Sequence, residues 1–441
     1  MSLSPAAIAT LSQLEFFGIK LGLETMQTLL QALGDPQRRF PGVLVAGTNG
    51  KGSTSTLLAA IAGHAGLTVG LYTSPHLESP RERVRVDGRA LPGPELSELL
   101  LEVVAVANRV LGAPPTYFEA FTAAAFCAFA RRQVDLAVLE VGMGGRLDAT
   151  NTADPILSIV TPIGLDHQQY LGNTLTEIAG EKAGVLRRGA PAVAWVPAGE
   201  ARTALAAAAT RLGCDLEFAD TTCTVAAIGH PDWTGTELRA RTPAGDHLLR
   251  SSLLGAHQLG NIALAVRAAE RLRQLGWTAI GDGAIARGVA AARWPGRLER
   301  VDLRDGRRVL LDGAHNPDGA DVLASFLRSA GGPYDLLFGA LADKETERML
   351  PQLVRGARRV TLTSPPSPRA LAPAELLPWV EGTETIVEAS PDRALDLALA
   401  ALGPGGAPLV VCGSLYLVGA LRHALRQRFG VPPAAEDVAL W

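Results

Sequence analysis

Continuous apolar runs alternate with helical stretches along most of the chain. The run VLVAG, which starts at Val43, leads through a glycine-rich turn into the helical stretch STLLAAIAGHAG. The runs DLAVLEVG near Asp135 and PILSIVTPIG near Pro155 are rich in valine, isoleucine and leucine, as strands covered on both faces are. The helical stretch FEAFTAAAFCAFARR separates the first run from the second. This order predicts an α/β fold with a mainly parallel sheet.

A second α/β unit follows the sequence RWPGRLER, whose proline and glycine are typical of a domain junction. This unit opens with RRVLLDGAHNP, continues in a helical stretch from Asp318, and contains the strand candidates YDLLFGA, RRVTLTS and PLVVCGS. A chain of 441 residues exceeds the usual size of a single core. We therefore expect two α/β domains. The N-terminal domain, at 1–296, contains the strand, glycine-rich turn and helix typical of a P-loop ATPase-like domain, and the C-terminal domain, at 297–441, is Rossmann-like.

Composition excludes several classes of protein. The chain has 41 basic and 44 acidic residues, a balance that disfavours a nucleic-acid partner. No apolar stretch approaches the roughly 20 residues that span a bilayer, so no membrane partner is expected. The N-terminus lacks the features of a signal peptide, which predicts a cytoplasmic location. Four widely spaced cysteines without a CxxC pair predict free thiols; they are Cys127, Cys214, Cys223 and Cys412.

The segment GTNGKGST, from Gly47 to Thr54, carries the main chemical signal. A glycine turn between a strand and a helix lets successive backbone amides face a phosphate, and the helix N-terminus adds a positive dipole. Lys51 would neutralise the outer phosphates. The spacing differs from GxxxxGKS because Gly52 separates the lysine from Ser53. A tight structural turn is the alternative for this segment.

This segment resembles the ATP loop of the Mur ligase and folylpolyglutamate synthase superfamily. The folate branch of that superfamily is similar at further points in the same order along the chain. They are FGIKLGLE near Lys20, TSPHL at Thr73, YFEAFTAAAF at Tyr117, EVGMGGRLDATN at Glu140, IGLDHQQYLG at Ile163, EKAG at Glu181, HQLGNIALA at His257, WPGR at Trp294, DGAHNP at Asp312 and GALADKE at Gly339.

The resemblance implies ATP as a co-substrate, two magnesium ions and a carbamylated Lys182 that orients the second ion. The implied ATP-binding residues are Gly47, Thr48, Asn49, Gly50, Lys51, Gly52, Ser53, Thr54, Asn261, Arg297, Asp312 and His315. The implied metal ligands are Ser74, Glu140, His167 and Ser53, and the implied catalytic residues are Lys51, Glu140, His167 and Lys182. Hydroxyl, carboxylate and phosphate oxygens suit magnesium, which retains several waters and needs few protein ligands.

Each of these residues also has a purely structural alternative. Ser74 suits a turn, Glu140 an exposed strand end, His167 a core and Lys182 a surface helix. The alternative for Asp312 and His315 is a capping turn between a strand and a helix.

The resemblance also implies a pterin or folate site. Its residues are Phe118, Glu119, Thr122, Leu147, Asp148 and Ala149. An aromatic face and a carboxylate suit a flat ring that bears amino and NH donors. Phe118, Phe121 and Phe126 equally fit one buried face of a helix.

The implied activity is ATP-dependent addition of L-glutamate to a reduced folate and to dihydropteroate, through an acyl phosphate and in a monomer. Two alternatives are a Mur-type amino-acid ligase of cell-wall precursors and a nucleotide-hydrolysing switch. The cell-wall ligases usually carry an extra N-terminal domain, for which the stretch before Gly47 is too short. The switch would turn over ATP without either folate or glutamate.

Overall fold

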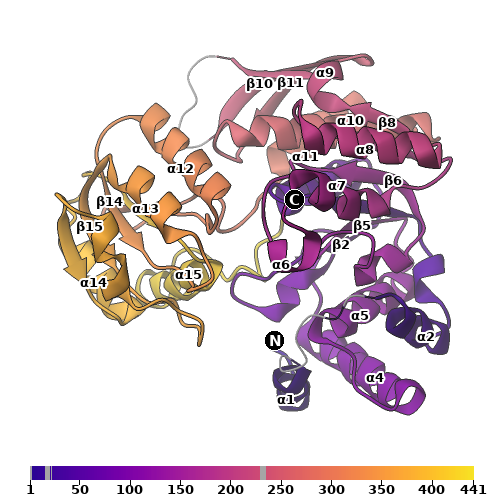
Figure 1. Ribbon diagram of the computed structural model, residues 1–441, viewed down its shortest axis with the longest axis horizontal. Coiled ribbons are helices and arrows are strands. Elements are labelled where there is room, and N and C mark those ends of the chain that lie inside the picture. Colours follow the sequence, from indigo (N-terminus) through magenta and orange to yellow (C-terminus); the bar gives the residue numbers. More distant parts are fainter. Residues whose placement is uncertain (1, 15–19, 21, 229–234) are drawn as a thin grey trace.

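The computed structural model describes residues 2–14, 20, 22–228 and 235–441. Four residues of the motif FGIKLGLE, at positions 17–19 and 21, lie outside this part of the chain. The described residues form two α/β units that lie side by side, with the second unit, drawn in orange and yellow, on the left of Figure 1.

An eight-stranded sheet forms the centre of the first unit in the described chain, in the order β4–β3–β2–β5–β1–β6–β7–β8. Its strands are β1 (Gly42–Ala46), β2 (Val69–Tyr72), β3 (Val84–Val86), β4 (Arg89–Ala90), β5 (Leu136–Glu140), β6 (Pro155–Val160), β7 (Pro191–Ala194) and β8 (Asp215–Phe218). Strands β2, β5, β1, β6, β7 and β8 are parallel, and β3 pairs antiparallel with both of its neighbours, β2 and β4. Since β1 and β5 are buried at every position, both faces of the sheet are covered.

Helices cover the two faces of this sheet. The first face packs against α3 (Lys51–His64), α10 (His257–Gln274) and α11 (Asp282–Ala291). The second face packs against α1 (Pro5–Leu14), α2 (Glu24–Ala32), α4 (Gly93–Leu111), α5 (Tyr117–Arg131), α7 (Leu175–Lys182) and α8 (Glu200–Leu212). A small antiparallel sheet lies over α10 and α11 and comprises β9 (Thr224–Ala227), β10 (Thr236–Thr242) and β11 (Gly245–Ser251).

The second unit is a six-stranded sheet within the described residues, in the order β12–β13–β17–β14–β15–β16. Its strands are β12 (Glu299–Asp302), β13 (Arg308–Leu311), β14 (Tyr334–Phe338), β15 (Ala357–Leu362), β16 (Glu384–Val387) and β17 (Leu409–Cys412). All pairs are parallel except β12–β13. One face packs against α12 (Pro317–Ala330) and α13 (Thr346–Val354), and the other against α14 (Pro391–Ala400) and α15 (Leu415–Phe429). The predicted α/β class is thus confirmed for both units.

The end of the chain returns to the first unit (Figure 1). Leu440 is buried in the same core as α3, and the indole of Trp441 lies against Gly63 and Gly88. The buried guanidinium of Arg85 donates to the carbonyl oxygens of Ala435 at 2.8 Å and Val438 at 2.9 Å. A boundary at residues 296 and 297 stays a prediction, and these contacts attach the last residues to the first unit.

Two expectations from composition can be compared with the structure. All four cysteines are free. A search of the described residues finds no helix with the length and apolar character needed to cross a membrane.

Candidate active site

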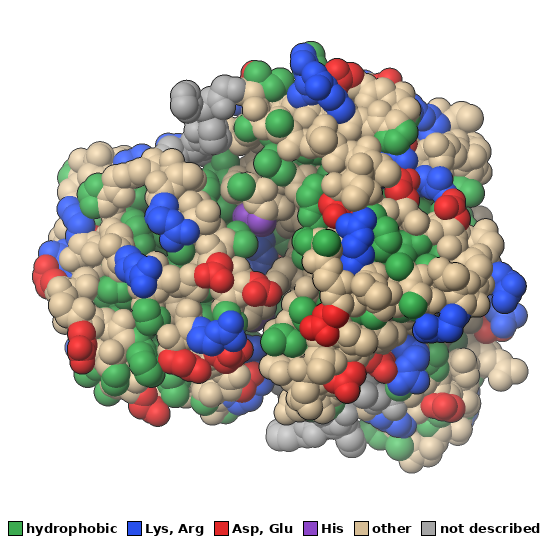
Figure 2. Space-filling view, turned by 45° about the horizontal axis from the view of Figure 1, so that its top comes forward, with side chains coloured by type: hydrophobic (Ala, Val, Ile, Leu, Met, Phe, Trp, Pro, Cys, Tyr) green, Lys and Arg blue, Asp and Glu red, His purple; other side chains and the backbone are tan. Residues whose placement is uncertain are grey.

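A cavity of about 930 Å³ lies between the two units. Figure 2 shows it as a hollow that separates the two halves of the molecule. The first unit contributes the turn after β1 and the ends of β2 and β5, and the second contributes the turns after β13 and β17. Ligands of open α/β sheets bind at the carboxyl ends of the strands, which is where this cavity lies.

Most of the residues proposed from the sequence line this cavity. They are Thr48, Asn49, Gly50, Lys51, Gly52, Ser53, Ser74, Phe118, Glu119, Glu140, Leu147, Asp148, Ala149, His167, Asn261, Arg297, Asp312 and His315. Four others, Gly47, Thr54, Thr122 and Lys182, are not part of its lining. The buried hydroxyl of Thr122 donates to the Phe118 carbonyl at 2.8 Å, so it supports the wall from behind.

The turn between β1 and α3 has the shape of a phosphate loop. Gly50 adopts a left-handed conformation with φ of 86°, and an added Cβ there would lie 2.3 Å from Oδ1 of Asn261. Both requirements exclude a side chain at this position. Helix α3 then begins at Lys51, whose Nζ donates to the carbonyl oxygens of Gly47 at 3.2 Å and Thr48 at 3.0 Å. The lysine therefore folds back over the loop, where it can meet a bound phosphate.

Lys182, at the end of α7, contacts the first residue of this loop. Its Nζ donates to the Gly47 carbonyl at 2.8 Å, and the side chain is 3% exposed. The surface alternative for Lys182 is therefore wrong. Burial, together with the charge of Lys51, lowers the pKa of Lys182 to about 7. A large share of this amine is consequently uncharged at neutral pH.

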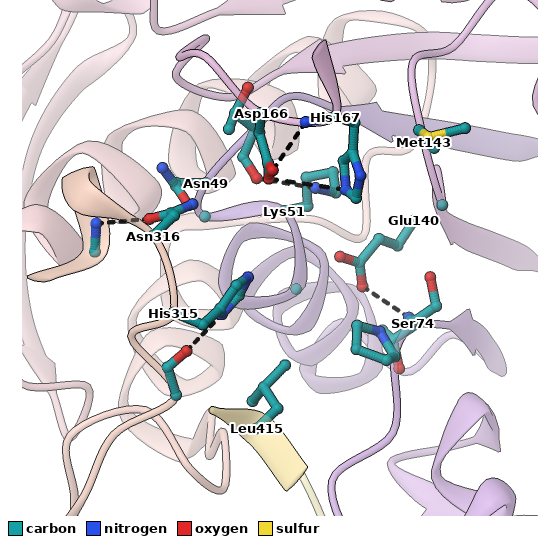
Figure 3. A pocket seen from close by; sticks show the side chains of 18 of the residues that line it. Asn49, Lys51, Ser74, Glu140, Met143, Asp166, His167, His315, Asn316 and Leu415 are labelled. Carbon is teal, nitrogen blue, oxygen red and sulfur yellow. Dashed lines mark hydrogen bonds and ion pairs between the residues drawn. The ribbon is translucent and has the colours of Figure 1, made fainter. Parts of the chain in front are cut away.

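Ser74 and Glu140 meet on the other side of the loop (Figure 3). The backbone NH of Ser74 donates to Oε2 of Glu140 at 3.2 Å. Glu140 ends β5 and is 4% exposed, which contradicts the exposed alternative. Burial raises its pKa to about 7, although the charge of Lys51 opposes this shift. Glu140 forms no ion pair with a lysine or arginine in the described part of the chain, although the charges of Lys51, Arg297 and Arg83 all favour its ionised form.

His167 lies at the mouth of the cavity beside Asp166. Its backbone NH donates to Oδ1 of Asp166 at 2.9 Å, and its side chain is 45% exposed. The core alternative for His167 is therefore wrong. Partial burial of the ring is the largest cause that lowers the pKa of His167, although the charge of Asp166 opposes the shift. The lowered pKa favours the neutral imidazole that a metal needs. Asp166 precedes His167 in the motif IGLDHQQYLG, which could have suggested it as a further site residue.

The second unit presents Asp312 and His315 to the cavity. The carboxylate of Asp312 accepts hydrogen bonds from the backbone NH groups of Leu298 at 2.8 Å and Ala314 at 2.9 Å. Asp312 therefore fixes the turn after β13 but does not cap α12. The cap of that helix is Asn316, whose Oδ1 accepts from the Gly319 NH at 2.8 Å. Nδ1 of His315 lies 2.7 Å from the Gly313 carbonyl, and burial lowers the pKa of His315 to about 4. His315 is therefore neutral at neutral pH.

Two further residues of the second unit face the phosphate loop. Nδ2 of Asn316 donates to Oδ1 of Asn49 at 3.3 Å, which links the units directly (Figure 3). Among the described residues, no carboxylate pairs with Arg297. Its charge is therefore available to a phosphate in the cavity. Asn316 belongs to the motif DGAHNP, but we had expected only Asp312 and His315 of that motif to act.

An aromatic and acidic wall closes the opposite end of the cavity. Phe118 lines it, whereas Phe121 and Phe126 are fully buried core residues. Oε2 of Glu119 accepts from the Thr116 backbone NH at 2.8 Å. Its buried Oε1 has no protein hydrogen-bond partner within the described chain, so it can accept from a ligand.

The loop that holds Asp148 completes this wall. Oδ2 of Asp148 accepts from the Met143 backbone NH at 2.9 Å, and Oδ1 accepts from that of Thr150 at 3.0 Å. These bonds fix the carboxylate beside Leu147 and Ala149, which also line the cavity. An aromatic ring and two carboxylates are therefore available to a flat ring with NH donors.

A metal ion bound here would need ligands from outside the protein. A search of the described residues finds no group of three or more His, Cys, Asp and Glu side chains that could hold an ion unaided. Magnesium is usually bound by one or two carboxylates together with phosphate and water oxygens. The pair of Ser74 and Glu140 fits such a site.

Comparisons with known proteins give one consistent result. The chain matches the Mur ligase middle domain over residues 45–269 and the Mur ligase glutamate ligase domain over residues 296–415. It is 34% identical to the dihydrofolate synthase/folylpolyglutamate synthase of Bacillus subtilis over 427 residues, which cover 93% of this chain and 96% of that protein. It is 36% identical to the folylpolyglutamate synthase of Lacticaseibacillus casei, with 90% of this chain and 93% of that protein covered.

A solved structure agrees with these relatives. E. coli FolC in complex with DHPP and ADP superimposes with a TM-score of 0.84 at 32% identity, and the match covers 96% of this chain and 98% of that one.

Proposed function

Because the chain belongs to the Mur ligase family, we propose that it is an ATP-dependent ligase that joins L-glutamate to folates and to dihydropteroate. The observation that carries the proposal is the cavity itself. It brings a phosphate loop, a buried carboxylate and a ring-binding wall together with groups of the second unit. The cell-wall ligase and the nucleotide-hydrolysing switch are not favoured, since the relatives that match nearly the whole chain are named as folate enzymes.

The reaction forms an amide bond in two transfers. A carboxylate oxygen of the acceptor attacks the γ-phosphorus of ATP, and the bond between this phosphorus and the β,γ-bridging oxygen breaks. ADP is released, and the acceptor carboxylate has become an acyl phosphate. The neutral glutamate amine then attacks the acyl carbon, and its nitrogen loses a proton to solvent. Phosphate leaves the tetrahedral intermediate, and the amide remains. Because water would hydrolyse the acyl phosphate, the reaction needs a closed cavity between the units.

The lining residues suit these steps. We assign the ATP phosphates to the turn Gly47–Thr54, where Lys51 neutralises charge, and the transferring phosphoryl group to Lys51 and Arg297. Asn261, Asp312 and His315 hold the rest of the nucleotide. The acceptor ring lies against Phe118, between Glu119 and Asp148.

Magnesium belongs to this proposal. Ser74, Glu140, His167 and Ser53 would hold it, and the ions would neutralise phosphate oxygens in the transition state. The buried, unpaired Glu140 carboxylate beside Ser74 supports the fit, because ionisation at that depth is favoured by a nearby cation.

Carbamylation of Lys182 is a further part of the proposal. Carbon dioxide adds only to a neutral amine, and the lowered pKa of about 7 supplies one at neutral pH. We expect activity to rise when bicarbonate is returned to protein depleted of carbon dioxide, and to fall as pH drops below about 7, where the amine gains a proton. Turnover should be measured with and without bicarbonate across pH. Activity that ignores bicarbonate would remove the carbamate from the mechanism.

The proposed function predicts glutamate addition to both kinds of acceptor. Purified protein with ATP, magnesium and glutamate should release phosphate in the presence of either dihydropteroate or tetrahydrofolate, and each product should gain the mass of one glutamyl group. Addition to one acceptor alone would leave a single activity. Phosphate release that is independent of acceptor, without any adduct, would instead support the switch.

We also infer that the enzyme acts as a monomer, the state that the resemblance to the folate branch implies. Sedimentation of the purified chain with and without ATP would test this. A cytoplasmic location stays a prediction.

A further inference from the structure

The loop that carries Leu147, Asp148 and Ala149 is fastened to the end of α7. The Arg146 backbone NH donates to the Glu181 carbonyl at 2.9 Å. Nδ2 of Asn151 donates to the carbonyl oxygens of Arg146 at 3.1 Å and Gly184 at 3.0 Å. Since Asn151 is 9% exposed, water competes little for these bonds. The acceptor loop is thus held against the turn that follows Lys182.

Arg187 adds further hydrogen bonds between the acceptor loop and the turn after α7. Its Nη2 donates to the carbonyl oxygen of Asn151 at 3.2 Å, to Oδ1 of Asn151 at 2.8 Å and to the Ala153 carbonyl at 3.3 Å. Its Nη1 donates to the carbonyl oxygens of Gly184 at 3.1 Å and Leu186 at 3.2 Å. One planar guanidinium therefore joins the acceptor loop to the turn after α7, a geometry that the point charge of a lysine cannot reproduce.

The two segments also touch through their backbones. A Cβ added to Gly184 would lie 2.3 Å from Cα of Arg146, and one added to Gly145 would lie 2.9 Å from the Glu181 carbonyl oxygen. Neither glycine leaves space for a side chain. The backbone of this loop therefore lies in direct contact with the end of α7 and the turn that follows it.

The end of α7 is itself joined to the phosphate loop. Lys182, five residues before Arg187, donates to the Gly47 carbonyl at 2.8 Å. Hydrogen bonds therefore connect Asp148 to Asn151, and Asn151 through Arg187 to the Gly184 carbonyl. The backbone joins Gly184 to Lys182, which binds Gly47. The acceptor wall and the phosphate loop are placed relative to each other by these connections.

We propose that Arg187 is a positioning residue that sets the acceptor loop against the phosphate loop, so that the acceptor carboxylate lies in line with the γ-phosphate. The inference rests on the proposed function, because it takes Leu147, Asp148 and Ala149 as acceptor contacts. Arg187 is absent from the cavity lining. Its effect on catalysis passes entirely through the loop.

The test compares the full-length wild type with Arg187→Ala, Arg187→Lys and Arg188→Ala. Arg188 is the neighbouring, exposed arginine, so its substitution removes the same charge but leaves the hydrogen bonds of Arg187 in place. We expect Arg187→Ala to raise the KM for dihydropteroate or tetrahydrofolate about tenfold, since several charge-assisted hydrogen bonds to the loop are lost. The KM for ATP should stay within about twofold, because the Lys182–Gly47 bond remains. The acceptor KM of Arg187→Lys should fall between those of the wild type and Arg187→Ala, and the acceptor KM of Arg188→Ala should match that of the wild type.

Hydrogen exchange of residues 144–153 in the ligand-free variants provides a readout that does not depend on activity. Exchange should be faster in Arg187→Ala than in Arg188→Ala at these residues and unchanged in β1. An acceptor KM that is unaltered in Arg187→Ala would overturn the proposal. So would an equal rise in both KM values with a general loss of protection, which would indicate a merely structural role. If the wild type adds glutamate to neither acceptor, the proposed function itself fails. The exchange data would still report whether Arg187 holds the loop of residues 144–153.

Discussion

Lys51→Ala is expected to abolish turnover while the fold stays intact. Lys51 starts α3 at the edge of the cavity, and its Nζ lies over the carbonyl oxygens of Gly47 and Thr48. In the proposed reaction it is one of two cations, with Arg297, that face the transferred phosphoryl group. Removal of one such group from a preorganised site costs about 10²–10³-fold in kcat. Lys51 forms no ion pair within the described part of the chain, and its Nζ binds only backbone carbonyl oxygens there, so its loss breaks no salt bridge of the fold.

Turnover, ATP affinity and thermal unfolding should be measured together for this variant. Lys51→Arg is the matched control, because it keeps the charge but changes the shape of the donor, and we expect it to retain part of the activity. An unchanged melting temperature would separate lost chemistry from lost folding. Undiminished ligation by Lys51→Ala would show that the turn is not a phosphate loop.

Glu140→Gln is expected to raise the magnesium concentration needed for half-maximal activity by about tenfold or more, because ion affinity depends on the charge of its ligands. The amide keeps the size of the carboxylate and can still accept from the Ser74 NH. In the wild type, burial raises the pKa of Glu140 to about 7. The magnesium requirement of the wild type should therefore increase as pH falls through this value, while that of Glu140→Gln should not follow the same titration.

Stability gives an independent check on this residue. A carboxyl whose pKa is raised on folding costs stability above its folded pKa, and the cost disappears below its unfolded pKa. In metal-free buffer, Glu140→Gln should therefore melt at a higher temperature than the wild type at pH 8, and this difference should vanish near pH 4. Glu98→Gln, at an exposed position of α4, is the control. A magnesium titration that is the same in Glu140→Gln and the wild type would remove Glu140 from the metal site.

Local features of the site could be read from the sequence because neighbouring residues determine them. The phosphate loop is one continuous segment, and its shape follows from glycine conformations between a buried strand and a helix. The turn of Asp312 is similar, since its carboxylate binds the backbone two residues further on. The α/β order of both units was equally visible in the apolar runs.

Other features depend on residues that are far apart in the chain. Lys182 and Gly47 are separated by 135 positions, and only their contact shows that Lys182 is buried with a pKa lowered to about 7. The motif around Thr122 suggested a ligand contact, yet its hydroxyl is turned to the backbone behind the wall. The periodicity of a helical segment indicates only roughly on which side of the helix a residue lies. The neighbouring elements decide which residues of that side reach the cavity.

By itself, the sequence determined the fold class, the glycine-rich turn after β1 and the set of motifs that gather at the cavity between the units, because these depend on short segments and on periodic burial. Only the tertiary structure decided which of those side chains face the cavity, which are uncharged at neutral pH, and how Asn316 and Arg187 join separate segments. The physical reason is that burial, and with it each pKa and each hydrogen bond between distant residues, is a property of the packed molecule. No local stretch of the chain contains it.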